Sequence, residues 1–156
     1  MREILFKAKR KDNGEWVEGL LWKKKYKSNK IFISCFPDKD DNEEVYVVDE
    51  NTICQYTGLT DKNGNKIWEN DILLQKTTEK HWCSWECMGI VRYGEMDWSE
   101  EWLGHKSVGF YIEPIKRKGN TKSIYYGICQ EYMTDKYFPI EVIGNIFDNP
   151  ELMKGE

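Results

Sequence analysis

The turn-forming residues between positions 55 and 74 constrain the fold of this chain more than any other segment. Three short apolar runs alternate there with two polar stretches, Asp61-Lys62-Asn63-Gly64 and Glu69-Asn70-Asp71. Asn-Gly between two strand-like runs is a strong hairpin signal, because both residues tolerate the positive φ that tight turns need. The segment therefore predicts three short strands joined by two tight turns.

The polar residues and glycines of this segment are explained by turn geometry without a catalytic role. An Asp side chain accepts hydrogen bonds from nearby backbone N–H groups, and Gly adopts backbone angles that other residues avoid. We expect Asp71 to act as such a local acceptor. The residues assigned to structural turns are Gly58, Asp61, Gly64, Asn70 and Asp71.

The rest of the chain is also strand-like, so the predicted fold class is mostly β with few short helical turns. β-branched and aromatic residues recur in short runs, which Gly, Pro, Asn and Asp interrupt. Short helical turns are expected within residues 95–103 and, with Asn149 as a capping side chain, from Pro150 onward, and a basic loop is expected over 116–122. The predicted strands cover residues 3–9, 15–22, 31–36, 45–48, 88–93, 107–113, 124–129 and 137–143.

The composition favours a cytoplasmic globular protein. The 156 residues carry a formal net charge of −4, and no apolar run approaches the ~20 residues of a membrane span. The N-terminal residues lack the apolar stretch of a signal peptide. Five cysteines are an odd number without paired spacing, so we expect reduced thiols rather than disulfides. We expect no membrane partner.

The nearest approach to a metal site is the cluster His81, Cys83 and Cys87. One imidazole and two thiolates suit zinc, but a tetrahedral site needs a fourth ligand. The residues available for that position are His105, Cys54 and Glu86. Structural zinc sites usually join two paired groups of ligands, and only one loose cluster is present. We favour a Trp-rich loop with incidental thiols, and we expect no metal and no other cofactor.

Four tryptophans in two polar stretches form the predicted binding interface: Trp82, Trp85, Trp98 and Trp102. Trp98 and Trp102 are spaced so that a short helix would place both on one face. Two interpretations remain open. The tryptophans cover the β-structure as a small additional core, or they form a contact surface for a partner subunit or protein. The acidic residues around them would favour a basic partner.

A second group of residues mixes aromatic and basic side chains. Trp22 and Tyr26 lie among the lysines of residues 23–30, and residues 116–122 are basic as well. Aromatic rings stack on bases and amines neutralise phosphates, so this pattern is typical of single-stranded nucleic-acid binding. A pI near 5.4 and acidic stretches of equal weight oppose that interpretation.

Four groups of motif residues span nearly the whole chain. They are Arg2-Glu3-Ile4 with Trp16-Val17 and Gly19, residues 55–59 with 61–64, residues 69–72 with Gly89-Ile90-Val91, and residues 140–152. In this order and combination they resemble the YopX family of phage and prophage proteins of Gram-positive bacteria. The resemblance implies a β-rich fold with an SH3-like barrel portion, and self-association. It implies no established activity.

Two features depart from the family pattern. The family usually has Gly where this chain has Asn70, and Asn is the non-Gly residue that best tolerates left-handed backbone. The resemblance therefore implies a positive φ at Asn70. Residues 77–87 and 95–106 resemble additions to a shorter family core, so we expect the properties particular to this protein there.

These observations predict an N-terminal β-hairpin or sheet unit over residues 1–54, packed on an SH3-like small β-barrel over residues 55–156. The predicted function is binding rather than catalysis, because the chain has no nucleophile motif, phosphate loop or His-Glu-x-x-His pattern. The predicted partner is a second copy of the chain, and an unidentified phage or host protein is a further candidate. The alternative is a nucleic-acid-associated accessory protein of phage replication or regulation.

Overall fold

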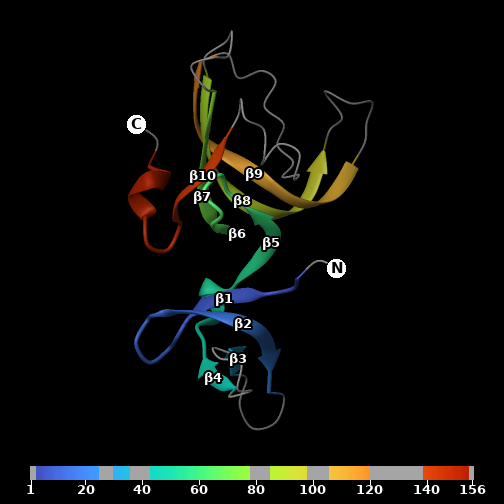
Figure 1. Cartoon of the computed structure of the whole chain (residues 1–156), viewed down its shortest axis with the longest axis vertical. Helices are drawn as coiled ribbons and strands as arrows, with labels where there is room; N and C mark the ends of the chain where they lie inside the picture. The colour runs from blue at the N-terminus through green and yellow to red at the C-terminus, as the bar shows by residue number, and fades with distance from the viewer. Residues whose placement is uncertain are drawn as a thin grey trace. The chain divides into compact units, whose positions relative to one another are not determined.

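The computed structural model divides the chain into two compact units, Met1–Gly58 and Leu59–Glu156. Antiparallel strands dominate both units, so the prediction of a mostly β fold is confirmed (Figure 1). Within the described ranges, no helix has the length and apolar composition needed to cross a membrane. The structure describes residues 3–24, 30–35, 43–77, 85–97, 106–119 and 139–154.

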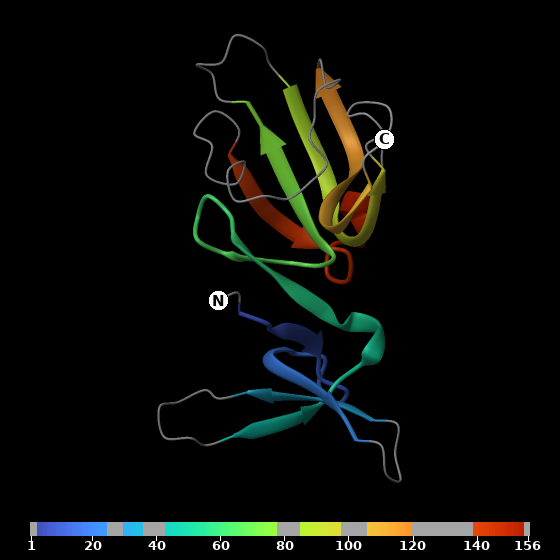
Figure 2. The ribbon, with the colours of Figure 1, turned by 90° about the vertical axis from the view of Figure 1, so that its right-hand side faces the viewer.

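The first unit is an antiparallel sheet with the strand order β4-β3-β2-β1-β5. Its elements are β1 (Phe6–Lys9), β2 (Trp16–Lys23), β3 (Ile31–Cys35), β4 (Glu44–Val47), the 3-10 turn η1 (Glu50–Thr52) and β5 (Cys54–Thr60). Figure 2 shows β3 and β4 side by side with opposite directions. Strand β5 continues past the end of this unit and pairs with β6 (Lys66–Trp68) of the second unit.

Strand β2 pairs with two strands, and its partner changes at Gly19. Its first half pairs with β1, where Gly19 lies opposite Phe6, and its second half pairs with β3, where Leu20 lies opposite Ser34. A Cβ atom on Gly19 would lie 2.0 Å from the backbone oxygen of Ser34. The close approach of Ser34 therefore requires glycine at position 19, and the ribbon of β2 is curved (Figure 1).

The curved sheet encloses a small core, and the residues that follow β1 contact the end of β4. Ala8, Ile33 and Val48 are at most 1% exposed and form the centre of this core. A bridge pairs Arg10 with Val48, and the N–H of Lys11 donates to the carbonyl oxygen of Val47 at 3.0 Å. The inner face of the sheet is thus buried, and the outer face of β2, β3 and β4 points away from the core.

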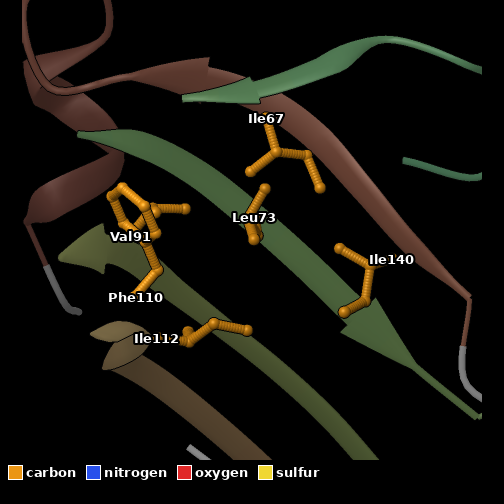
Figure 3. Packing of buried hydrophobic residues seen from close by; sticks show 6 residues of the cluster. All are labelled: Ile67, Leu73, Val91, Phe110, Ile112 and Ile140. Atoms are coloured by element: carbon orange, nitrogen blue, oxygen red, sulfur yellow. The ribbon is translucent and has the colours of Figure 1, made fainter. Parts of the chain in front are cut away.

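The second unit contains an antiparallel sheet with the strand order β10-β7-β8-β9. Its core unites Ile67, Leu73, Val91, Phe110, Ile112 and Ile140, which converge from five strands in Figure 3. The described strands form two sheets rather than a closed barrel, so the SH3-like barrel stays a prediction. The elements besides β6 are β7 (Asp71–Lys76), β8 (Trp85–Asp97), β9 (Lys106–Gly119), β10 (Ile140–Asn145) and the 3-10 turn η2 (Pro150–Met153).

Strands β8 and β9 are longer than predicted. Residues 95–97 belong to β8 rather than to a helical turn, and residues 116–119 belong to β9 rather than to a loop. The two strands pair along their whole length, from Trp85 opposite Gly119 to Asp97 opposite Lys106, with one bulge at Met88. This ladder satisfies the backbone groups of polar residues whose side chains carry no strand signal.

The C-terminal turn begins where it was predicted, but without the expected cap. Pro150 occupies the first turn of η2, as its missing N–H allows. The Asn149 side chain makes no capping hydrogen bond and instead accepts one from the N–H of Asn145 at 3.3 Å. The strand expected at 124–129 lies outside the described residues.

A candidate binding surface on the N-terminal unit

Gly64 lies in the turn between β5 and β6, whereas Gly58, also predicted as a turn residue, lies inside strand β5. Gly58 and Gly64 have φ of 86° and 85°, angles that favour glycine. The Asp71 side chain accepts a hydrogen bond from the N–H of Trp68 at 2.8 Å and is 2% exposed. Gly64 and Asp71 thus shape the backbone of the second unit, and Gly58 is the last residue of the first.

Asp61 is the centre of the hairpin turn and is 5% exposed. Its carboxylate accepts hydrogen bonds from the N–H groups of Asn63 and Asn65, from the Asn65 amide, and from the N–H of Val142 at 3.1 Å. Burial alone would raise the pKa of Asp61, but the bonds from Val142, Asn65 and Asn63 together lower it below its usual value. The carboxylate therefore fixes the β5–β6 turn to strand β10.

The predicted tryptophan interface and most of the metal candidates lie outside the described residues. Trp82, Trp98 and Trp102 belong to that remainder, as do His81 and Cys83. Trp85 begins strand β8, but its side chain is not among those described.

Cys87 is the one described member of the predicted metal cluster. It is 3% exposed, and burial raises the pKa of its thiol, which favours the protonated form over a metal-binding thiolate. Within the described residues, no group of three or more His, Cys, Asp or Glu side chains is placed to hold a metal ion.

The outer face of β2, β3 and β4 presents an apolar surface. The strand register places Leu20, Ser34 and Val45 in one row across the three strands, and Trp22, Phe32 and Val47 in the next. We call the five apolar residues of these rows the apolar face: Leu20, Trp22, Phe32, Val45 and Val47. Leu21 and Ile33, on the opposite face, belong to the core.

The apolar face is exposed at three of its five residues. The exposed fractions of Leu20, Trp22 and Val45 are 51%, 40% and 44%. Leu20 and Trp22 lie on β2 and Val45 on β4, with the half-buried Phe32 and the buried Ser34 of β3 between them, so the three residues share one side of the sheet. Exposed apolar patches mark sites where a partner binds.

Trp22 is held in place on the β2 side of the apolar face. Its ring stacks on Phe32 with the centroids 4.5 Å apart, and its indole N–H donates to the Ser34 hydroxyl at 2.8 Å. Because the polar group of the indole already has a partner, the exposed part of the ring is available for apolar contact. A tryptophan held in this way has little conformational entropy left to lose on binding.

Charged residues of opposite sign lie at the two ends of the three-stranded sheet. Lys23 and Lys24 end β2, and Lys30 immediately precedes β3. Glu43 and Glu44 lie at the start of β4, opposite the end of β3, and Glu44 accepts a hydrogen bond from the Tyr46 hydroxyl at 2.5 Å. All five charged residues are exposed.

The sequence of this chain matches a known family over nearly its whole length. The family model described as YopX protein matches residues 5–154. The chain belongs to the YopX family. Among the curated proteins compared, none matches this YopX chain.

A solved structure has the same fold as this YopX chain. It is the crystal structure of protein EF1440 from Enterococcus faecalis, with 22% sequence identity and a TM-score of 0.54. The match covers 99% of this chain and 100% of the other. At that identity the likeness shows the fold alone.

Asn70 has the left-handed backbone that the YopX resemblance implies, with φ of 67°. Its side chain has a second role, since its carbonyl oxygen accepts a hydrogen bond from Arg92 at 2.7 Å. Arg92 in turn pairs with Glu113 at 2.8 Å. Asn70 thus replaces the usual glycine of the family at a turn and adds a contact that glycine lacks.

Sequence reasoning missed the apolar face of this YopX protein. It recognised Trp22 only as a ring among lysines and treated the surrounding strands as scaffold. In β2 the adjacent residues Leu20 and Leu21 interrupt the alternation of apolar and polar side chains. Such a run is the available signal, because it means that both faces of the strand carry apolar residues.

Proposed function

We propose that this YopX protein is a non-enzymatic binding module that self-associates through the apolar face of its first unit. The observation that supports this most is that Leu20, Trp22 and Val45 are all exposed on the same side of the sheet formed by β2, β3 and β4. The family resemblance, which implies self-association, supports it independently. We place this role in the cytoplasm of a bacterium that carries the phage or prophage.

The chemistry of the face favours a protein partner. Leu20 and Val45 offer only aliphatic contact, and Trp22, stacked on Phe32, adds an aromatic ring whose position is fixed. Exposed aromatic residues beside aliphatic ones are typical of protein interfaces. The two rows of the apolar face contain no acidic, basic or histidine side chain. This composition is consistent with binding rather than catalysis.

The test replaces the two aliphatic residues with threonine. Leu20→Thr/Val45→Thr puts β-branched side chains, which suit strands, at both positions but places hydroxyl groups where apolar contact is expected. Each substitution should cost the interface about 1 kcal/mol, so a two-fold contact that contains four of them should weaken at least about 100-fold in Kd.

The measurement is the molecular mass at several protein concentrations by sedimentation equilibrium. The control is Val108→Thr, because Val108 is 67% exposed but lies in β9 of the other unit. The wild type and Val108→Thr should exceed the monomer mass of 18.6 kDa. A monomeric wild type, or equal association of all three proteins, would contradict the proposal.

The alternative function is a nucleic-acid-associated accessory protein. The observation that favours it is the exposed ring of Trp22 beside Lys23, Lys24 and Lys30, an arrangement that suits base stacking and phosphate contact. Titration of labelled single- and double-stranded DNA at two salt concentrations tests it. Binding that weakens steeply with salt and is lost in Trp22→Ala supports this function. No binding at low salt excludes it.

A further inference from the structure

The chain contains two Asn-Gly pairs, Asn13-Gly14 and Asn63-Gly64. The first lies in the turn between β1 and β2, and the second lies in the turn between β5 and β6. Asn-Gly is chemically labile, because glycine has no side chain to obstruct attack of its backbone nitrogen on the preceding asparagine side chain. The two turns therefore carry the same reactive pair, and the fold decides which pair can react.

The turn around Asn63 is held closed by a buried group. Asp61 is 5% exposed, and its carboxylate accepts hydrogen bonds from the N–H groups of Asn63 at 2.8 Å and of Val142 at 3.1 Å. The N–H of Gly64, which carries the attacking nitrogen, donates to the carbonyl oxygen of Asp61 at 3.0 Å. Attack by this nitrogen requires the turn to open against these bonds.

The turn around Asn13 is held closed by exposed groups. Residues 11–15 are all exposed, and the N–H of Gly14 donates to the carbonyl oxygen of Arg10 at 3.0 Å. The Asn13 amide donates to the Glu15 carboxylate at 2.6 Å, and its oxygen accepts from the N–H of Glu15 at 3.0 Å. Water replaces bonds between exposed groups at little net cost, so this turn opens more readily than the turn around Asn63.

We propose that Asn13 is a site of spontaneous deamidation and that the fold protects Asn63 from the same reaction. The backbone nitrogen of Gly14 forms a bond to Cγ of Asn13 while the bond from Cγ to Nδ2 breaks. The amide group leaves as ammonia with the proton of the Gly14 N–H, and a five-membered succinimide remains. Water then opens this ring. Aspartate results where the bond from nitrogen to Cγ breaks, and isoaspartate results where the bond from nitrogen to the backbone carbonyl carbon of Asn13 breaks.

The modification changes the charge of the β1–β2 turn. A carboxylate replaces the amide that donates to Glu15, so two like charges face each other where a hydrogen bond was. The protein gains one negative charge beyond its formal −4. This modification lies outside the apolar face and is independent of the proposed binding function.

The test follows deamidation of each asparagine by peptide mass spectrometry, in the native protein and in concentrated urea, at mildly alkaline pH. In the native protein Asn13 should react at least about tenfold faster than Asn63, because the turn around Asn63 must first break buried bonds. In urea the two rates should come within about threefold of each other, since both turns are then open. Asn51, which precedes Thr52, is the internal reference and should react more slowly than either.

Two variants test the two parts of the proposal. Asn13→Gln should abolish the more acidic species that the aged wild type shows on anion exchange, because glutamine would have to form a less favoured six-membered ring. Asp61→Asn should accelerate deamidation of Asn63 and leave that of Asn13 unchanged. Far-UV circular dichroism establishes that both variants are folded, and the comparison of native and urea rates in the wild type needs neither of them.

Three results would overturn the proposal. The first is deamidation of Asn63 as fast as that of Asn13 in the native protein. The second is an equal preference for Asn13 in urea, which would make the fold irrelevant. The third is a native rate at Asn13 no higher than that at Asn51.

Discussion

Replacement of Asp61 by asparagine should destabilise the second unit strongly, because the carboxylate makes four hydrogen bonds. Its Oδ1 accepts from the N–H groups of Asn63 and Asn65 at 2.8 and 2.9 Å. Its Oδ2 accepts from the Asn65 amide and from the N–H of Val142, both at 3.1 Å. In Asp61→Asn the side-chain carbonyl oxygen can keep the two bonds from the N–H groups of Asn63 and Asn65. The new NH₂ group, itself a donor, then faces the Asn65 amide and the N–H of Val142, which are donors as well.

The expected loss is about 3 kcal/mol at neutral pH. Two hydrogen bonds to a charged acceptor are removed, each worth about 1.5 kcal/mol or more, and Asp61 is 5% exposed, so water replaces them poorly. Equilibrium urea unfolding followed by far-UV circular dichroism measures the change. The protein concentration is held fixed, because self-association adds its own free energy.

The pH dependence of the loss tests its cause. The pKa of Asp61 is lower in the folded protein than in the unfolded chain, so the carboxylate contributes its full stability above about pH 4. That contribution disappears as the pH falls through the folded pKa. The difference between wild type and Asp61→Asn should therefore shrink from pH 7 to pH 3.

Asp12→Asn is the matched control, because Asp12 is an exposed turn residue that pairs with Arg10 in the first unit. It should leave the unfolding of the second unit unchanged. A loss below about 1 kcal/mol for Asp61→Asn, or a loss of equal size at both pH values, would refute the assignment of Asp61 as a charged hydrogen-bond centre.

Three further predictions concern single residues. Asn70→Ala should lower the free energy of unfolding by about 2 kcal/mol, because alanine disfavours the left-handed backbone at this position and the hydrogen bond from Arg92 is lost. Asn70→Gly should keep the free energy of unfolding within about 1 kcal/mol of the wild type, as measured by urea unfolding. Gly19→Ala should cost about 3 kcal/mol by the same measurement, since its Cβ would lie 2.0 Å from the Ser34 oxygen. Cys87 should react with iodoacetamide far more slowly in the native protein than in urea, as peptide mass spectrometry would show, because its thiol is buried with a raised pKa.

The turns of this fold are the part that sequence predicts best. Asp, Asn and Gly act locally, so the Asp61–Gly64 hairpin and the left-handed residue Asn70 are visible in a few adjacent residues. Strand ends are harder, because cross-strand pairing decides them. Residues 95–97 and 116–119 form strands because each segment pairs with the other long strand, β9 or β8.

The apolar face was beyond sequence reasoning for a different reason. The sequence alone does not distinguish an exposed leucine from a buried one. The register of β2, β3 and β4 shows that Leu20 and Val45 share a row, whereas Leu21 faces the core. The need for glycine at position 19 likewise depends on the distant residue Ser34, which packs against it. Aromatic content alone pointed instead to tryptophans elsewhere in the chain.

The central claim is that the apolar face is where copies of this protein meet, and methyl NMR on dilution tests it most directly. The sample is the wild-type protein with labelled Leu and Val methyl groups, diluted from a self-associating concentration to a monomeric one. The methyl signals of Leu20, Val45 and Val47 should shift, and those of Val108 should stay in place. Shifts confined to other residues, with these three unmoved, would contradict the claim.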